Sequence, residues 1–124
     1  MIEKVRWKDT SGKGRGVFAL EDIEEKELVE KSPVVPFPKS EMDLERKYET
    51  ALGQYQLWWS DEKDKECAIG FGYLMLYNHS ENPNIKLVRN YEDKTISVIA
   101  RRSINIGEEL VHQYHSGTWF EVKQ

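Results

Sequence analysis

Apolar and polar positions alternate in short runs along most of the chain, and turn-forming residues interrupt these runs at roughly regular intervals. Such spacing is typical of a mostly-β domain built from short strands. We expect strands at residues 5–7, 17–20, 28–35, 55–59, 85–88, 95–100 and 110–114. The runs 85–88 and 95–100 flank a polar turn and should form a hairpin. The pattern predicts a small barrel, a sandwich or a curved multi-sheet fold, and it does not choose among the three.

One segment, residues 40–53, has the period of a helix instead. An apolar residue recurs at every fourth position, at Leu44, Tyr48 and Leu52. This repeat places one apolar stripe along a helix. Ser40 is suited to cap the first turn and Gly53 to end the last one. We therefore expect one main helix in an otherwise β-rich domain.

Prolines interrupt the run at residues 28–35. Pro33, Pro36 and Pro38 should end this strand or hold its far end at a sheet edge, because proline donates no backbone hydrogen bond. The apolar segment 66–72 should be a short buried segment.

Length and composition indicate one globular domain. The 124 residues can bury a single core without metals or disulfides. Charged residues make up 32%, with 18 basic and 22 acidic side chains and a net charge of -4. This balance argues against a dedicated nucleic-acid binder, which shows a basic excess. It is compatible with a basic partner such as a lysine-bearing peptide.

The single cysteine, Cys67, excludes an intramolecular disulfide and a multi-cysteine zinc site. It lies in an apolar stretch, which favours a structural thiol over a reactive one. The first residues are charged, so we expect no signal peptide, and no stretch is long and apolar enough to span a membrane. We expect an intracellular protein in a reducing compartment, either the cytoplasm or a host nucleus.

The glycine-rich segment SGKGRG, residues 11–16, has two interpretations. Glycine lets the backbone adopt φ > 0 or come close to another group. The segment could therefore wrap a small ligand through its amides, or it could be a tight hairpin turn. No helix pattern follows it, which excludes a dinucleotide-binding fingerprint.

An apolar run breaks off at the motif NHSENPN, residues 78–84. We expect residues 73–79 to form one or two helical turns. A helix end that runs into an Asn-Pro turn explains the motif without any ligand. Against this, Asn78 follows the apolar run directly, and a buried amide must satisfy both of its ends, which is typical of a built site.

The segment GEELVHQY, residues 107–114, predicts a turn into a last strand that ends at Tyr114. Tyr114 could simply be a core aromatic residue with a wet hydroxyl. We expect no metal site, because no pair among His79, His112 and His115 has the helical i, i+4 spacing and no acidic residue joins them in a known pattern. The chain also lacks a serine-nucleophile motif and a phosphate-binding loop.

Three motifs in one order resemble a known family. GRGVFA at 14–19 comes first, NHSENPN at 78–84 follows, and GEEL at 107–110 leads to Tyr114. This order and spacing resemble the SET-domain protein lysine methyltransferases, in particular the minimal single-domain forms of viruses and bacteria. The resemblance covers nearly the whole chain and implies a single SET domain over residues 1–124. That fold is mostly β, with several small curved sheets around a knot-like, threaded C-terminal segment.

The family implies an activity and a cofactor. A methyl group would pass from S-adenosylmethionine to the ε-amine of a lysine in a basic protein tail, histone or histone-like, by in-line displacement. Asn78 and His79 would lie where the C-terminal strand passes beneath a loop and would hydrogen-bond the amino-acid end and the adenine of the cofactor. Pro83 and Asn84 would brace that crossing.

The resemblance also assigns individual residues. Tyr114 would be the catalytic residue beside the transferred methyl group. Tyr55 and Phe71 would line the channel for the substrate lysine. The cofactor-binding set would be Lys13, Gly14, Arg15, Gly16, Asn78, His79, Tyr114 and Trp119.

The chain departs from the family pattern at two places. Glu81 stands where many members have cysteine, and no cysteine-rich, zinc-binding tail follows. His112-Gln113 stand where Asp or Ser is commoner beside the tyrosine, which leaves the number of transferred methyl groups open. This difference keeps a non-catalytic, peptide-binding SET module as the alternative, and an unrelated small β-barrel interaction protein as a third. We also expect a homodimer that completes the substrate groove, and neither nucleic acid nor membrane as a partner.

Overall fold

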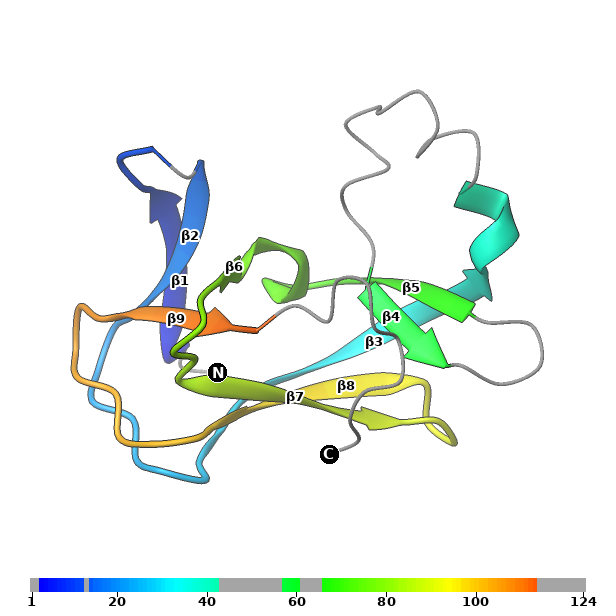
Figure 1. Cartoon of the computed structure of the whole chain (residues 1–124). Coiled ribbons are helices and arrows are strands. Elements are labelled where there is room, and N and C mark those ends of the chain that lie inside the picture. The colour runs from blue at the N-terminus through cyan, green and yellow to red at the C-terminus, as the bar shows by residue number, and fades with distance from the viewer. Residues whose placement is uncertain (1–2, 13, 43–56, 61–65, 114–124) are drawn as a thin grey trace.

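The computed structural model describes residues 3–12, 14–42, 57–60 and 66–113. In this part the chain is mostly β, as the sequence predicted (Figure 1). The strands are β1 (Val5–Asp9), β2 (Arg15–Ala19), β3 (Leu28–Pro38), β4 (Leu57–Ser60), β5 (Glu66–Gly70), β6 (Asn78–His79), β7 (Ile85–Asn90), β8 (Thr95–Ala100) and β9 (Glu109–His112). Two 3₁₀ helices accompany them in this part, η1 (Lys39–Met42) and η3 (Leu74–Leu76).

The described strands form two sheets. The first has the order β1-β2-β9-β6 and the second β4-β5-β3-β8-β7. Figure 1 shows the β1–β2 hairpin at one end of the molecule and β4 and β5 at the other, with the long strand β3 extending toward β5. The expected hairpin is present, since β7 and β8 pair antiparallel over their whole lengths.

Strand β9 lies inside the first sheet. It pairs antiparallel with β2, where Val17 faces Leu110, and parallel with β6, where Asn78 faces Val111. A strand late in the sequence therefore lies between two strands that precede it. This arrangement agrees with the threaded C-terminal segment that the family resemblance implied.

Strand β3 is longer than predicted and continues through its prolines to Pro38. Its first half, up to Pro33, pairs with β8, and its second half, from Val34, pairs with β5. Among the described residues, each half of β3 thus pairs with a strand on one side only. A proline fits in such a strand because its missing N–H can face the unpaired side. The prolines therefore lie where the strand has an open side, as one of the two expectations had it. They do not end the strand, as the other had it.

The expected main helix is not borne out. The described start of that segment is the short η1, and Ser40 lies inside it instead of capping it. Ser40 and Glu41 are exposed, so this turn carries no apolar stripe that could hold it against the core. Residues 43–53, which include the periodic apolar positions, lie outside the described residues. Of the one or two helical turns expected over residues 73–79, η3 is present at Leu74–Leu76, whereas Asn78 and His79 form the strand β6 instead.

Both sheets supply the core. Val17 and Leu110 come from the first sheet, and Ile96 and Val98 from the second, and all four are fully buried. At the edge of this core, the buried Trp59 ring meets the exposed Tyr91 ring edge to face, at 5.0 Å between centroids. Cys67 is a buried thiol that is not part of a disulfide, in agreement with a structural role.

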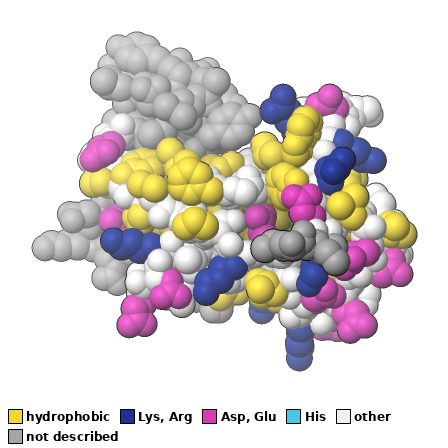
Figure 2. All heavy atoms as spheres, turned by 180° about the vertical axis from the view of Figure 1, so that it is seen from behind, with side chains coloured by type: hydrophobic (Ala, Val, Ile, Leu, Met, Phe, Trp, Pro, Cys, Tyr) yellow, Lys and Arg dark blue, Asp and Glu magenta, His cyan; other side chains and the backbone are white. Residues whose placement is uncertain are grey.

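The surface is mixed in character. Figure 2 shows apolar patches among scattered charges of both signs on one face. The large apolar side chains that the described part exposes are Trp7, Leu20, Leu28, Val35, Phe71, Tyr91 and Ile106. No helix of the described residues has the length and apolar character needed to cross a membrane.

Candidate active site

The Asn-His motif lies beside the last described strand. Strand β6 is parallel to β9, with Asn78 opposite Val111 and His79 opposite His112. Just after β6, the Ser80 N–H donates to the His112 carbonyl at 2.9 Å. Two of the three sequence motifs therefore meet along one strand pair.

The glycine-rich segment forms the turn between β1 and β2. Thr10 donates from its N–H and its hydroxyl to the Gly14 carbonyl, at 2.7 and 2.8 Å. Gly12 and Gly14 have φ angles of 104° and 77°, which glycine adopts without steric cost. The hairpin interpretation is therefore confirmed for the turn itself.

Gly16 is buried at the start of β2 and has a different role. A Cβ at this position would lie 2.6 Å from Glu109 Oε2 and 3.0 Å from Asn78 Nδ2. Any larger side chain would have to displace one of these polar groups. Gly16 therefore allows β2 to approach both Glu109 on β9 and Asn78 on β6 closely.

The Asn78 side chain joins all three motifs. Its Nδ2 donates to the Arg15 carbonyl at 3.0 Å and to Glu109 Oε2 at 2.8 Å. Asn78 is half-buried, as its place behind the apolar run suggested. We call Arg15, Gly16, Asn78 and Glu109 the polar corner.

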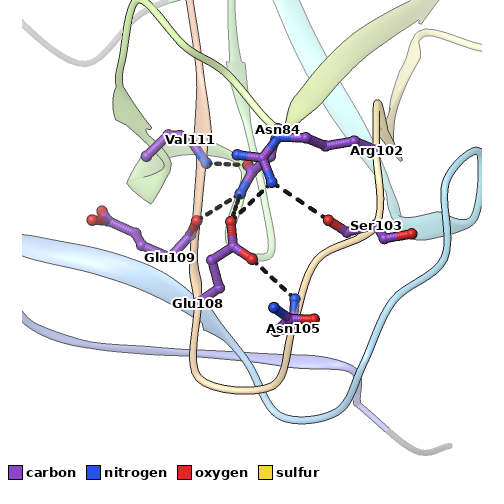
Figure 3. A network of polar contacts seen from close by, with 7 residues as sticks. All are labelled: Asn84, Arg102, Ser103, Asn105, Glu108, Glu109 and Val111. Carbon is purple, nitrogen blue, oxygen red and sulfur yellow. Dashed lines mark hydrogen bonds and ion pairs between the residues drawn. The ribbon is translucent and has the colours of Figure 1, made fainter.

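Asn84 is buried beside the polar corner and holds β9 in place (Figure 3). Its Oδ1 accepts the Val111 N–H at 2.8 Å, and its Nδ2 donates to the Glu109 carbonyl at 2.8 Å. Its own N–H donates to the Val111 carbonyl at 3.1 Å. The side chain thus pairs with the backbone of β9 on either side of Leu110, which agrees with the bracing role expected of Asn84.

Glu108 orders the turn that leads into β9 (Figure 3). Its Oε1 accepts the Asn105 N–H at 2.9 Å, and its Oε2 accepts from Arg102 Nη1 at 3.0 Å and Asn84 Nδ2 at 3.3 Å. The bond from the Asn105 N–H, followed by those from Arg102 and Asn84, holds the pKa of Glu108 below its ordinary value of 4.5, although burial opposes this. The carboxylate therefore stays ionised and keeps its three donors at neutral pH.

The chain matches the family model described as the SET domain over residues 14–115. It belongs to the SET-domain family. A histone-lysine N-methyltransferase of Schizosaccharomyces pombe, specific for lysine 37 of H3, is 39% identical over 114 residues, which are 92% of this chain and 75% of the relative. The predicted SET-domain protein lysine methyltransferase is therefore confirmed.

Solved structures show the same SET fold. A candidate histone methyltransferase of Plasmodium falciparum has a TM-score of 0.70 at 26% identity, and the match covers 98% of this chain and 100% of that one. A humanized mutant of the Chaetomium thermophilum Polycomb Repressive Complex 2, bound to an inhibitor, has a TM-score of 0.72 at 22% identity. That match covers 98% of this chain and 16% of the other, and it supports the fold alone.

The described part of this SET domain brings several predicted cofactor residues together. Arg15, Gly16 and Asn78 meet in the polar corner, while Gly14 lies in the preceding turn and His79 is exposed at the end of β6. Phe71, predicted for the lysine channel, follows β5 and is 52% exposed. Four further predicted residues lie outside the described residues, so their roles stay predictions: Lys13, Tyr55, Tyr114 and Trp119. The described strand β9 ends at His112, two residues before Tyr114.

Glu109 belongs to the GEEL motif, but the sequence analysis gave its side chain no part in this corner. It directly precedes the buried Leu110 and was expected only in the turn that leads into the last strand. Its contact with Asn78 depends on the pairing of β6 with β9, which no local pattern predicts. Within the described ranges, no group of three or more His, Cys, Asp or Glu side chains could hold a metal ion.

Proposed function

We propose that this SET domain transfers a methyl group from S-adenosylmethionine to a lysine ε-amine in a histone tail. The observation that carries the proposal is the polar corner, where the Asn78 amide joins the glycine-rich strand to β9 just before Tyr114. Family membership supports the reaction class. The closeness of Gly16 to Asn78 and Glu109 supports the polar corner as the place of the cofactor.

The chemistry of the polar corner fits this cofactor. The Arg15 carbonyl and the Glu109 carboxylate are acceptors that converge on one amide. Acceptors and a negative charge suit a ligand that carries an ammonium and a sulfonium cation. Arg15 and Asn78 would hold the amino-acid end, and the backbone of His79 the adenine. When bound, the cofactor supplies an electrophilic methyl group.

The protein must also present the substrate lysine as a neutral amine. With a pKa of about 10.4, roughly one lysine in 2,500 is neutral at pH 7, a cost of about 4.6 kcal/mol. A narrow channel lowers this cost because desolvation and a neighbouring positive charge both depress the lysine pKa. Tyr55 and Phe71 would line that channel. The Tyr114 hydroxyl and backbone carbonyls would hold the amine in line, and its proton would leave to water before the channel closes.

A histone H3 tail is the substrate that we infer. The S. pombe relative is specific for lysine 37 of H3, and its 39% identity extends over most of both chains. The net charge of -4 suits a basic tail. We also infer that a second copy completes the substrate groove, which gel filtration with light scattering tests directly.

The decisive experiment measures methyl transfer from a radiolabelled donor to an H3 peptide that contains lysine 37. The matched control is the same peptide with that lysine replaced by arginine. Tyr114→Phe should lower turnover at least about tenfold, because alignment supplies most of the rate, while cofactor binding measured by calorimetry persists. Unchanged turnover would remove Tyr114 from the mechanism. A wild-type protein that releases no heat with S-adenosylmethionine would favour a peptide-binding module instead.

A further inference from the structure

A carboxylate of the second sheet contacts the segment that leads into β6. Glu30 lies on β3, where a bulge shifts the pairing register between Leu28 and Glu30. Its Oε1 accepts the Tyr73 N–H at 3.3 Å and the Ser32 hydroxyl at 3.1 Å. Its Oε2 accepts the Tyr77 hydroxyl at 2.5 Å. One side chain thus connects β3 to both ends of the segment that contains η3.

Gly72 leaves the space that the Glu30 carboxylate occupies. Its φ is +69°, and a Cβ there would lie 2.7 Å from Glu30 Oε1 and 3.2 Å from Ser32 Oγ. Glycine is therefore favoured twice, for its backbone angle and for the space that it leaves to the carboxylate. The close approach of Glu30 to this segment therefore depends on the backbone at Gly72 as well as on the rotamer of Glu30.

Tyr77 is a donor that stays protonated. Its side chain is 2% exposed. Burial, and then the negative charge of Glu30, hold the pKa of its hydroxyl well above the ordinary value of 10.0. The hydrogen bond to Glu30 therefore persists across the neutral and mildly alkaline range.

Strand β6 needs such an anchor because it has two residues, Asn78 and His79. A strand this short makes few ladder hydrogen bonds of its own. Its position depends on what holds the chain just before and just after it. On the far side, Ser80 and Asn84 bond to β9, and on the near side Tyr77 bonds to Glu30.

We propose that Glu30 and Tyr77 are a positioning pair that fixes the entry of β6, and with it the place of Asn78 and His79 in the cofactor site. The pair acts through its neighbours and is not placed against the reacting atoms. The inference rests on the proposed function, since the positioned residues are those that would hold the cofactor. It assigns a role in cofactor binding to a carboxylate on the second sheet, away from every sequence motif.

The first test needs no cofactor. Tyr77→Phe removes the hydroxyl that bonds to Glu30. The matched control is Tyr91→Phe, which removes the hydroxyl of an exposed tyrosine. Amide hydrogen exchange, followed by NMR, should become at least about tenfold faster at Ser80, whose N–H bonds to β9, because its anchor loosens. The amides of the β7–β8 hairpin should keep their rates. The control variant should change neither.

The second test separates positioning from overall stability. Tyr77→Phe should raise the dissociation constant for S-adenosylmethionine about tenfold and leave KM for the peptide unchanged, because the half-buried Glu30 carboxylate loses the donor that fixes the entry of β6. Glu30→Ala should do the same. Glu30→Gln should restore much of the affinity, since its amide can still accept from Tyr73 and contact the Tyr77 hydroxyl.

Each outcome decides the proposal. Faster exchange at Ser80 with weaker cofactor binding, rescued by Glu30→Gln, supports the positioning pair. A lower melting temperature with unchanged exchange at Ser80 and unchanged cofactor affinity would overturn it and leave a packing contact. If the wild-type protein does not bind the cofactor, the proposed function fails, and the exchange measurement still decides whether Glu30 and Tyr77 position β6.

Discussion

Replacing Asn84 with alanine tests how β9 is held inside the first sheet. The change removes the acceptor of the Val111 N–H and the donor to the Glu109 carbonyl, both at 2.8 Å. Asn84 is 1% exposed, so water cannot readily replace either partner. A buried backbone donor without an acceptor costs about 1–3 kcal/mol, and an orphaned carbonyl adds a smaller amount. We expect the free energy of unfolding to fall by about 2–4 kcal/mol.

Urea unfolding, followed by tryptophan fluorescence, measures this loss. The m-value should stay the same, because the surface exposed on unfolding hardly changes. Asn82→Ala is the matched control, since Asn82 is an exposed asparagine in the same loop, and its effect should stay within about 0.5 kcal/mol. A loss below about 1 kcal/mol for Asn84→Ala would refute the view that this amide replaces strand pairing along β9.

Asn84→Asp separates the donor from the acceptor. The aspartate keeps the acceptor for Val111, but it turns an oxygen toward the Glu109 carbonyl and toward Glu108 Oε2, which Nδ2 now contacts at 3.3 Å. These neighbours raise the pKa of the new carboxyl in the folded state, so its destabilising effect is full at neutral pH. As the pH falls, the carboxyl gains a proton and can donate again, and the loss should shrink. A loss that does not change with pH would contradict this account.

Two further substitutions test individual polar groups. The pKa of Glu108 is lowered from 4.5 first by the Asn105 N–H, so its carboxylate stabilises the fold above that pH and loses this effect as the pH falls through the lowered value. Glu108→Gln should therefore cost about 1–2 kcal/mol at neutral pH and much less near pH 3, by paired denaturant titrations, and an equal cost at both would contradict the reasoning. The Thr95 hydroxyl is buried without a partner among the described residues, so Thr95→Val should raise the melting temperature by about 3–6 °C in calorimetry. Thr10→Val, which removes a bonded hydroxyl, should have the opposite sign, and the same sign for both would count against this explanation.

Local patterns predicted the elements whose two faces differ. Strand β8 alternates buried and half-buried positions, and both its place and its hairpin with β7 were predicted. The length of β3 was not, because its prolines are tolerated through a change of pairing partner at Val34 that no local signal contains. The helix expected at 40–53 rested on the spacing of apolar residues and on Ser40 and Gly53 as its caps, and its described start is a 3₁₀ turn.

In the candidate site, too, local patterns predicted some residues and missed those whose contacts depend on distant parts of the chain. Asn78 stood out because it directly follows an apolar run and a buried amide must be satisfied, whereas the role of Asn84 came from the family resemblance alone. Glu109 and Glu30 did not stand out, because Glu109 meets Asn78 across 31 positions and Glu30 meets Tyr77 across 47. A lone carboxylate in a charged sequence resembles any solvated side chain until the fold supplies its partner.

The insertion of β9 between β2 and β6 also constrains how the protein is made. On the ribosome, the β1–β2 hairpin and the β6 corner are synthesised before the strand that must join them. Until residues 109–112 emerge, both carry open backbone edges, and such edges invite pairing with other nascent chains. Contacts between such distant positions also form slowly. The polar corner therefore assembles only after β9 has been synthesised, and a chaperone that shields those edges should raise the yield of folded protein.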